Sequence, residues 1–307
     1  MTGGTGFVGS NIVHEAVREG HEVVTTYRSY RPSGRERYTL RRVNMLDRAA
    51  VLRDVKAFAP DIVVHCAILN DLASLYRDRG AAWDSYVEAT RATAEAASVA
   101  GASYILVSTD WVFDGTQAGA DESTPPNPIN LYGVLKMASE LVALERGGAV
   151  ARVSGVNGIH RARLAAPRAQ DAGFGYFVAS LVDRLERGRT FTVWESDRIN
   201  MRATPSLASE CAEMILEIGR RRLTGVFHCC GADGVGRMEL ARLACTVFDL
   251  DPGLLASSPP GTAGLPGVRI PYDTTLIAPR TSALLERHPT PLRTLLERFR
   301  DQYQLRP

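Results

Sequence analysis

Apolar residues follow two alternating patterns in the first half of the chain. Short, largely apolar runs predict strands over residues 22–27, 40–43, 62–66, 104–108 and 149–153. Between them, apolar residues at helical spacing predict helices over residues 7–19, 48–58, 82–100 and 131–145. The runs at 62–66 and 104–108 suit strands buried on both faces. The pattern therefore predicts an α/β fold with a doubly wound, Rossmann-like parallel sheet.

The alternation becomes less regular after residue 155. Helices are predicted over 174–187, 205–220 and 237–248, a strand over 191–194, and a loop over the Pro- and Gly-rich stretch 251–271. We therefore expect a dinucleotide-binding domain at 1–155 and a smaller substrate-binding lobe at 156–307, from which the chain can return to the main sheet.

The composition excludes several classes of protein. The 307 residues are 45% hydrophobic and 23% charged, as in ordinary globular proteins, and no apolar run reaches the roughly 18 residues of a membrane helix. A net charge of +2 gives no general attraction to nucleic acid. The five cysteines lack metal-site spacing, so no metal is expected. We expect a cytoplasmic protein with a small-molecule partner, either a monomer or a homodimer.

A glycine-rich loop opens the chain. Gly3, Gly6 and Gly9 directly precede a predicted helix, an arrangement that lets a dinucleotide pyrophosphate approach the amides of the helix N-terminus. Such a loop normally follows a strand, yet only Met1 precedes Thr2. The first strand is therefore expected to be largely missing from this chain, as if its start had been assigned too late.

The end of the second strand indicates which dinucleotide binds. An acidic residue about 20 positions beyond the loop would hold the 2′-hydroxyl of NAD(H). The sequence at 25–29 has no carboxylate, and Arg28 is followed by Arg31, Arg35 and Arg37. Arginine matches a 2′-phosphate, so NADP(H) is preferred, with NAD(H) left open.

Tyr132 and Lys136 lie one turn apart on the predicted helix 131–145, so both side chains share one face. An ammonium beside a phenol favours the phenolate and is expected to bring the tyrosine pKa toward neutrality for acid–base catalysis. Only two of the 36 basic residues are lysines, Lys56 and Lys136. Ser108 and Thr109, at the end of a buried strand, place hydroxyls at the carboxyl edge of the sheet.

Several runs of residues together resemble the extended short-chain dehydrogenase/reductase superfamily, and within it the dTDP-4-dehydrorhamnose reductase branch. The specific runs are 2–9, 65–67, 108–115 and 128–136, and weaker ones lie at 197–205 and 225–228.

The resemblance implies roles for individual residues. Tyr132 would be the general acid, Lys136 its partner, and Ser108 or Thr109 the hydroxyl that bonds the substrate carbonyl. The implied cofactor residues are Gly3, Thr5, Gly6, Phe7, Val8, Arg28, Asp47, Cys66, Ala67, Tyr132 and Lys136. The implied substrate residues are Thr109, Asp110, Trp111, Asn157, Arg198 and Arg202.

Two positions depart from the family pattern. Trp111 stands where the branch usually has tyrosine, and Tyr86 stands where the superfamily has an asparagine that supports a proton relay. The resemblance implies an NADPH-dependent reductase of a nucleotide-linked 4-keto-6-deoxysugar, with hydride transfer and tyrosine as proton donor. The alternatives are a carbonyl reductase or epimerase of specialised metabolism, or a non-catalytic NADP-binding regulatory protein like the regulatory subunit of methionine adenosyltransferase.

Overall fold

The computed structural model describes residues 1–27, 31, 37–69, 72–163, 169–261 and 267–305. Its main sheet has four parallel strands in the order β10-β5-β4-β3: β3 (Ile62–His65), β4 (Ser103–Thr109), β5 (Ala149–Val153) and β10 (Gly225–Cys229). Strand β10 comes from the second half of the chain, which thus returns to the main sheet.

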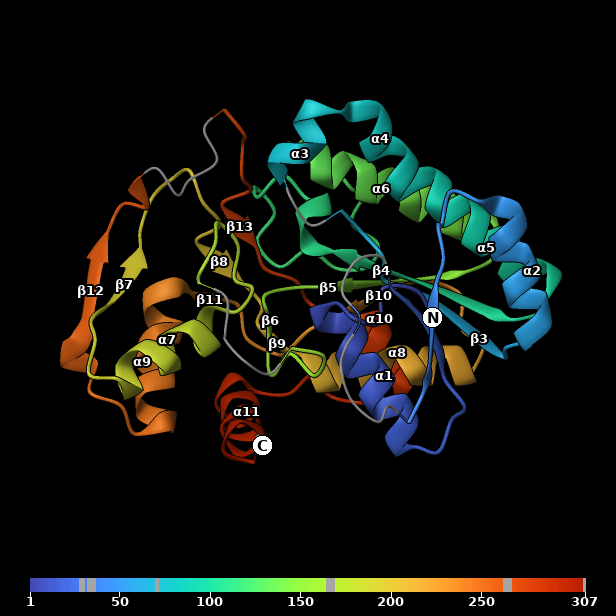
Figure 1. Ribbon diagram of the computed structural model, residues 1–307. Coiled ribbons are helices and arrows are strands. Elements are labelled where there is room, and N and C mark those ends of the chain that lie inside the picture. Colours follow the sequence, from blue (N-terminus) through green and yellow to red (C-terminus); the bar gives the residue numbers. More distant parts are fainter. Residues whose placement is uncertain (28–30, 32–36, 70–71, 164–168, 262–266, 306–307) are drawn as a thin grey trace.

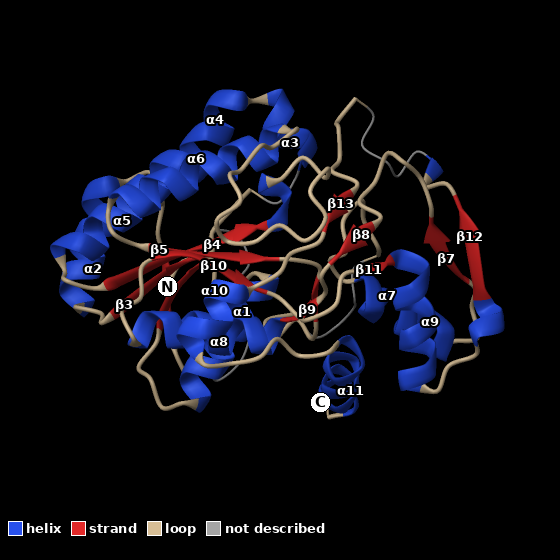
Figure 2. Cartoon of the chain, turned by 180° about the vertical axis from the view of Figure 1, so that it is seen from behind, coloured by secondary structure: helices blue, strands red, loops and turns tan. Residues whose placement is uncertain are grey.

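Helices cover both faces of this sheet (Figure 2). Helices α2 (Arg48–Phe58), α5 (Ala89–Val99) and α6 (Leu131–Glu145) lie on one face, and α1 (Phe7–Arg18), α8 (Ala208–Arg220) and α10 (Pro279–Leu285) on the other. Strand β4 is buried along almost its whole length, as expected for a strand covered on both faces. The predicted doubly wound α/β fold is confirmed.

The expected gap lies next to β3. Strands β1 (Val24–Tyr27) and β2 (Thr39–Arg42) form a separate parallel pair, and Met1 and Thr2 link it to the main sheet. The Thr2 N–H donates to the Val64 carbonyl at 2.9 Å, and the Thr26 N–H donates to the Met1 carbonyl at 3.1 Å. Met1 and Thr2 therefore bridge β3 and the β1–β2 pair.

The predicted helix over 82–100 is longer and interrupted. It comprises α3 (Leu72–Arg77), α4 (Arg79–Trp83), a π-helical turn at Asp84–Glu88, and α5. The Asp78 carboxylate accepts a hydrogen bond from the Ala81 N–H at 2.9 Å and so caps α4. A π-turn inside a helix often marks a functional site, and this one carries Tyr86.

The second half builds a smaller lobe at one end of the molecule (Figure 1). Its main elements are α7 (Phe177–Glu186), β7 (Phe191–Trp194), α9 (Arg237–Phe248) and β12 (Leu255–Ser258). The prediction of a continuous loop over 251–271 is wrong, because β12 pairs in parallel with β7. The prediction missed this short strand because the residues on either side of it are rich in Pro and Gly.

Several short elements lie between the main sheet and the lobe or within the lobe. They are a 3-10 turn at Asp110–Val112, β6 (Val156–Asn157), β8 (Arg202–Ala203), β9 (Ser206–Leu207), β11 (Val235–Gly236), a 3-10 turn at Pro252–Leu254 and β13 (Asp273–Thr274). Helix α11 (Leu292–Gln304) follows near the C-terminus. Within the described residues, no helix is long and apolar enough to cross a membrane.

Candidate active site

The glycine-rich loop is packed too tightly for side chains. Gly3 has φ +68°, and a Cβ there would lie 2.7 Å from the Ala67 nitrogen. A Cβ on Gly9 would lie 2.2 Å from the Gly3 carbonyl oxygen. Helix α1 begins after Gly6 with no side-chain cap and no acidic residue in its first turn. Its first amides therefore remain available to an anion, as a pyrophosphate site requires.

The remaining predicted cofactor residues surround this loop. Thr5 lies in its turn, and Phe7 and Val8 in the first turn of α1. The N–H groups of Cys66 and Ala67, just after β3, donate to the Thr2 carbonyl and hydroxyl, both at 3.3 Å. Asp47 is exposed and caps α2 through the Ala50 N–H at 2.9 Å. Arg28 lies outside the described residues.

Tyr132 stands on the first turn of α6, which Asn130 caps by accepting from the Gly133 N–H at 2.9 Å. The half-buried phenol ring makes edge contacts with Trp111 (ring centroids 5.9 Å apart) and Tyr86 (6.1 Å). Burial raises the pKa of Tyr132 to about 12, and a hydrogen bond with the Thr109 side chain opposes the rise. The expected lowering of this pKa is wrong for this structure, because desolvation is the largest influence on the phenol.

Lys136 is buried one turn further along α6. Its Nζ donates to the Val107 carbonyl of β4 at 2.6 Å. Burial lowers the pKa of Lys136 to about 8, while the Glu140 carboxylate raises it. Lys136 is therefore largely protonated at neutral pH but titrates far below an ordinary lysine.

Ser108 and Thr109 point to opposite sides of β4, as neighbours in a strand must. The Thr109 hydroxyl donates to Asp110 Oδ1 at 3.0 Å, accepts from the Trp111 N–H at 3.2 Å and lies within hydrogen-bonding reach of Tyr132. The Ser108 hydroxyl instead donates to Glu140 Oε1 at 2.5 Å inside the protein. The structure thus brings Thr109 to the phenol, whereas Ser108 is buried and hydrogen-bonded within the protein.

Two predicted substrate residues are interior structural groups. The Asp110 carboxylate accepts from the hydroxyls of Ser154 at 2.8 Å and Thr274 at 2.6 Å, and burial raises its pKa. Asn157 is fully buried: its Oδ1 accepts from the Val178 N–H at 3.3 Å, and its Nδ2 donates to a backbone carbonyl. In this structure the polar atoms of both side chains are therefore hydrogen-bonded within the protein interior.

The other predicted substrate residues differ in position. Trp111 packs between Tyr132 and the small lobe, against Ile199 and Ile270. Arg198 and Arg202 are exposed, and Arg202 forms an ion pair with Asp273 at 3.4 Å. Among the described residues, no hydrogen bond or ion pair joins either arginine to Tyr132 or Thr109. Trp111 thus contacts Tyr132 directly, whereas the two arginines lie on the surface of the small lobe.

Tyr86, which stands where the superfamily has the relay asparagine, is a buried aromatic residue. The Tyr86 hydroxyl donates to the Leu69 carbonyl at 2.8 Å, and its ring supports Tyr132. Tyr86 thus packs against Tyr132, and its side chain has no amide for a relay.

Glu140 and Arg152 form a buried ion pair that was not predicted from the sequence. Arg152 donates through Nε and Nη2 to the two oxygens of Glu140, at 3.0 and 2.7 Å, and both residues are buried. The available signal was the spacing Tyr132, Lys136, Glu140, which continues one helix face for a further turn.

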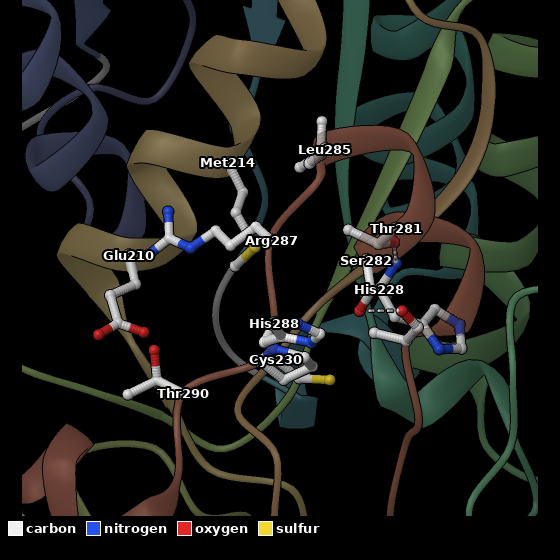
Figure 3. A pocket seen from close by; sticks show the side chains of 12 residues that line it. Glu210, Met214, His228, Cys230, Thr281, Ser282, Leu285, Arg287, His288 and Thr290 are labelled. Atoms are coloured by element: carbon white, nitrogen blue, oxygen red, sulfur yellow. Dashed lines mark hydrogen bonds between the residues drawn. The ribbon is translucent and has the colours of Figure 1, made fainter.

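A separate cavity lies between α8, α10 and the end of β10 (Figure 3). His228, Cys230, Glu210, Arg287 and His288 are among its lining residues, and none of the predicted site residues is. Among the described residues, no group of three or more His, Cys, Asp or Glu side chains could hold a metal ion.

The parallel sheet, the glycine loop at α1 and the Tyr132–Lys136 pair define a member of the extended short-chain dehydrogenase/reductase superfamily, a class of oxidoreductases. Within it, the chain belongs to the RmlD substrate binding domain family, whose model matches residues 1–304. The predicted family is confirmed.

Relatives of known sequence include two kinds of protein. Methionine adenosyltransferase 2 subunit beta of Bos taurus is 27% identical over 267 residues, which cover 81% of this chain and 72% of that protein. The probable low-salt glycan biosynthesis reductase Agl14 of Haloferax volcanii is 27% identical over 261 residues, which cover 84% and 82%.

Solved structures share the fold along nearly the whole chain. A hypothetical dTDP-4-dehydrorhamnose reductase from Sulfolobus tokodaii has a TM-score of 0.76 and 26% identity, and covers 95% of this chain and 97% of its own. The dTDP-4-dehydrorhamnose reductase from Bacillus anthracis in complex with NADP has a TM-score of 0.76 with 20% identity, covers 97% and 96%, and shows likeness of fold alone.

Proposed function

We propose that the protein is an NADPH-dependent reductase of a nucleotide-linked 4-keto-6-deoxysugar. The observation that carries the proposal is the pairing of the Tyr132 phenol with the Thr109 hydroxyl at the carboxyl end of β4. Two hydroxyls side by side can both donate to one carbonyl oxygen, where negative charge develops during reduction. The named relatives of the reductase kind support the substrate class.

The loop at the start of α1 fits a dinucleotide, because its glycines leave no room for side chains and its helix amides have no cap. Gly3, Thr5, Gly6, Phe7 and Val8 would hold the pyrophosphate, and Cys66 and Ala67 would line the adjoining edge. The preference for NADP(H) rests on Arg28. When bound, the cofactor supplies the hydride.

The residues of the chain then have separable tasks. The raised pKa of Tyr132 keeps its proton in place until the carbonyl oxygen becomes basic, when the phenol gives it up. The Thr109 hydroxyl, which donates to Asp110 Oδ1 at 3.0 Å in this structure, would turn its hydrogen to that oxygen as a second donor. The ammonium of Lys136 favours the resulting phenolate, and Trp111 forms an apolar wall that orients the sugar and excludes water. Arg198 and Arg202, exposed on the small lobe, would contact the diphosphate.

The experiment is NADPH oxidation by the purified protein against nucleotide-linked 4-keto-6-deoxysugars and simpler ketones, with Tyr132→Phe as matched control. Turnover of a keto sugar that the variant lacks is the expected result. Turnover of only simple ketones would assign a carbonyl reductase instead, and bound NAD that co-purifies and recycles would assign an epimerase.

A regulatory role is the second candidate, favoured by the similarity to methionine adenosyltransferase 2 subunit beta over 81% of the chain. It predicts NADP binding without oxidation of any carbonyl compound, and a stable complex with a methionine adenosyltransferase catalytic subunit. Retention of Tyr132, Lys136 and Thr109 in one site favours catalysis.

A further inference from the structure

We infer that Glu140 is a positioning residue that keeps the Lys136 ammonium charged, and that Ser108 and Arg152 hold the Glu140 carboxylate in place for that role. This inference deepens the proposed function and rests on it only for its catalytic consequence.

The geometry ties Glu140 to both the strand and the helix of the site. Glu140 follows Lys136 by one turn of α6, on the same face. Its Oε1 accepts from the Ser108 hydroxyl at 2.5 Å and from Arg152 Nε at 3.0 Å, and its Oε2 accepts from Arg152 Nη2 at 2.7 Å. Three donors from β4 and β5 therefore fix a carboxylate that has no contact with solvent.

The other groups around Lys136 carry no compensating charge. His65 and Cys66, at the end of β3, interact with the ammonium, but burial lowers the pKa of His65 to about 3 and raises that of the Cys66 thiol to about 12. Burial lowers the pKa of the Met1 amine, which acts on the same two groups, to about 6, and an amine in either protonation state supplies no negative charge. Asp110 acts on Tyr132 rather than on the lysine. Glu140 is thus the carboxylate that offsets burial of Lys136 in the described structure.

On the side away from Glu140, Arg152 contacts His228 and Phe113, and neither of them carries a negative charge. His228 Nδ1 bonds the Ile277 carbonyl at 2.8 Å, so Nδ1 carries the hydrogen and Nε2 accepts from Arg152 Nη1 at 3.4 Å. Burial lowers the pKa of His228, and the neutral ring lines the cavity drawn in Figure 3. Arg152 also lies over the Phe113 ring at 5.1 Å. Arg152 therefore serves Glu140, and its orientation is fixed from three sides.

Because the chain has only two lysines, their titration can be followed directly. Protein labelled with ¹³C at lysine Cε gives two NMR signals, and exposed Lys56 is the internal reference. Loss of a nearby opposite charge typically shifts a pKa by about one unit or more. We expect Glu140→Gln to lower the Lys136 pKa by at least about one unit. Glu140→Asp keeps the negative charge, so its Lys136 pKa should lie close to the wild-type value.

Two further variants make the result decisive. Glu145→Gln removes an exposed carboxylate from the same helix and should leave the Lys136 signal unchanged. Glu140→Gln combined with Arg152→Met leaves no unpaired guanidinium behind. Lys136 in this double variant should still titrate below its wild-type pKa, so it provides the test if the single variant does not fold. An unchanged Lys136 pKa in folded Glu140 variants, or an equal shift in Glu145→Gln, would overturn the inference.

The catalytic consequence is measured separately. In Glu140→Gln, the alkaline limb of kcat/KM should move to lower pH by the same amount as the NMR pKa. If the NMR shift occurs while no variant or wild type reduces any carbonyl compound, the proposed function fails and the charge coupling stands.

Discussion

The two sides of β4 at its carboxyl end carry similar hydroxyls with different surroundings. On one side, Thr109 lies beside the Tyr132 phenol, which in turn contacts the Trp111 ring. On the other, Ser108 donates into the buried Glu140–Arg152 ion pair. The chemical type of a residue at the edge of the sheet therefore does not fix its role, because a step of one residue along the strand exchanges the reacting face for the interior.

Helix α6 connects the two sides. Tyr132, Lys136 and Glu140 follow one another at intervals of four residues, from the half-buried phenol to a fully enclosed carboxylate. The inferred coupling would thus make the proposed chemistry at Tyr132 depend on a charge held two turns deeper in the protein.

The largest effect is expected at the reacting face. Tyr132→Phe should lower kcat by about 10² to 10⁴, since the ring still packs against Trp111 and Tyr86 while the proton donor is lost. Cofactor affinity, measured by fluorescence titration, should change little. Retention of more than half of the wild-type kcat would show that Tyr132 is not the general acid.

The next variants compare the two hydroxyls directly. Thr109→Val should lower kcat by about 10² to 10³, as loss of one donor to a developing oxyanion does elsewhere, and Thr109→Ser should recover most of it. Ser108→Ala should cost less than about tenfold, since its hydroxyl only supports Glu140. A larger loss in Ser108→Ala than in Thr109→Val would reverse the assignment of the two faces.

A variant of Arg28 tests cofactor preference separately from the chemistry at Tyr132. Arg28→Asp should weaken NADPH binding by about 10- to 100-fold and NADH binding far less, since a charge-assisted hydrogen bond contributes roughly 1.5 to 3 kcal/mol. Isothermal titration with both cofactors measures the ratio. Equal weakening of both would remove Arg28 from the 2′-phosphate site.

The pH dependence of kcat/KM is expected to show the smallest effect, and it tests the role of the buried Lys136. Tyr132 with a pKa of about 12 stays protonated throughout the working range, whereas Lys136 with a pKa of about 8 loses its charge as pH rises. The logarithm of kcat/KM should therefore be level below about pH 8 and fall with unit slope above it. A level profile up to pH 10 would mean that the lysine charge does not assist the phenol.

Much of this arrangement followed from sequence, for identifiable reasons. Buried parallel strands such as β3 and β4 leave continuous apolar runs, and the glycines of the first loop precede an unambiguous helix. The Tyr132–Lys136 pair needed only helical periodicity. These features depend on local sequence, which is why they were predictable.

Other features depend on contacts between distant segments. Which of Ser108 and Thr109 meets Tyr132 depends on how β4 faces α6, and the burial that raises the Tyr132 pKa comes from Trp111, Tyr86 and their neighbours. Asp110 resembles a substrate ligand until Thr274, 164 residues away, is seen to donate to it. Strand β12 forms only because β7 is available as its partner.

The central claim is that Tyr132 protonates a sugar carbonyl that receives hydride at this site. The most direct test is a single-turnover reaction of wild-type protein with a nucleotide-linked 4-keto-6-deoxysugar and NADPH deuterated at nicotinamide C4, with the product analysed by mass spectrometry and NMR. The account predicts deuterium at the new carbinol carbon, formed at least about 10² times more slowly in Tyr132→Phe. Bound NADPH with no deuterium transferred to any keto sugar, or equal transfer by the variant, would contradict it.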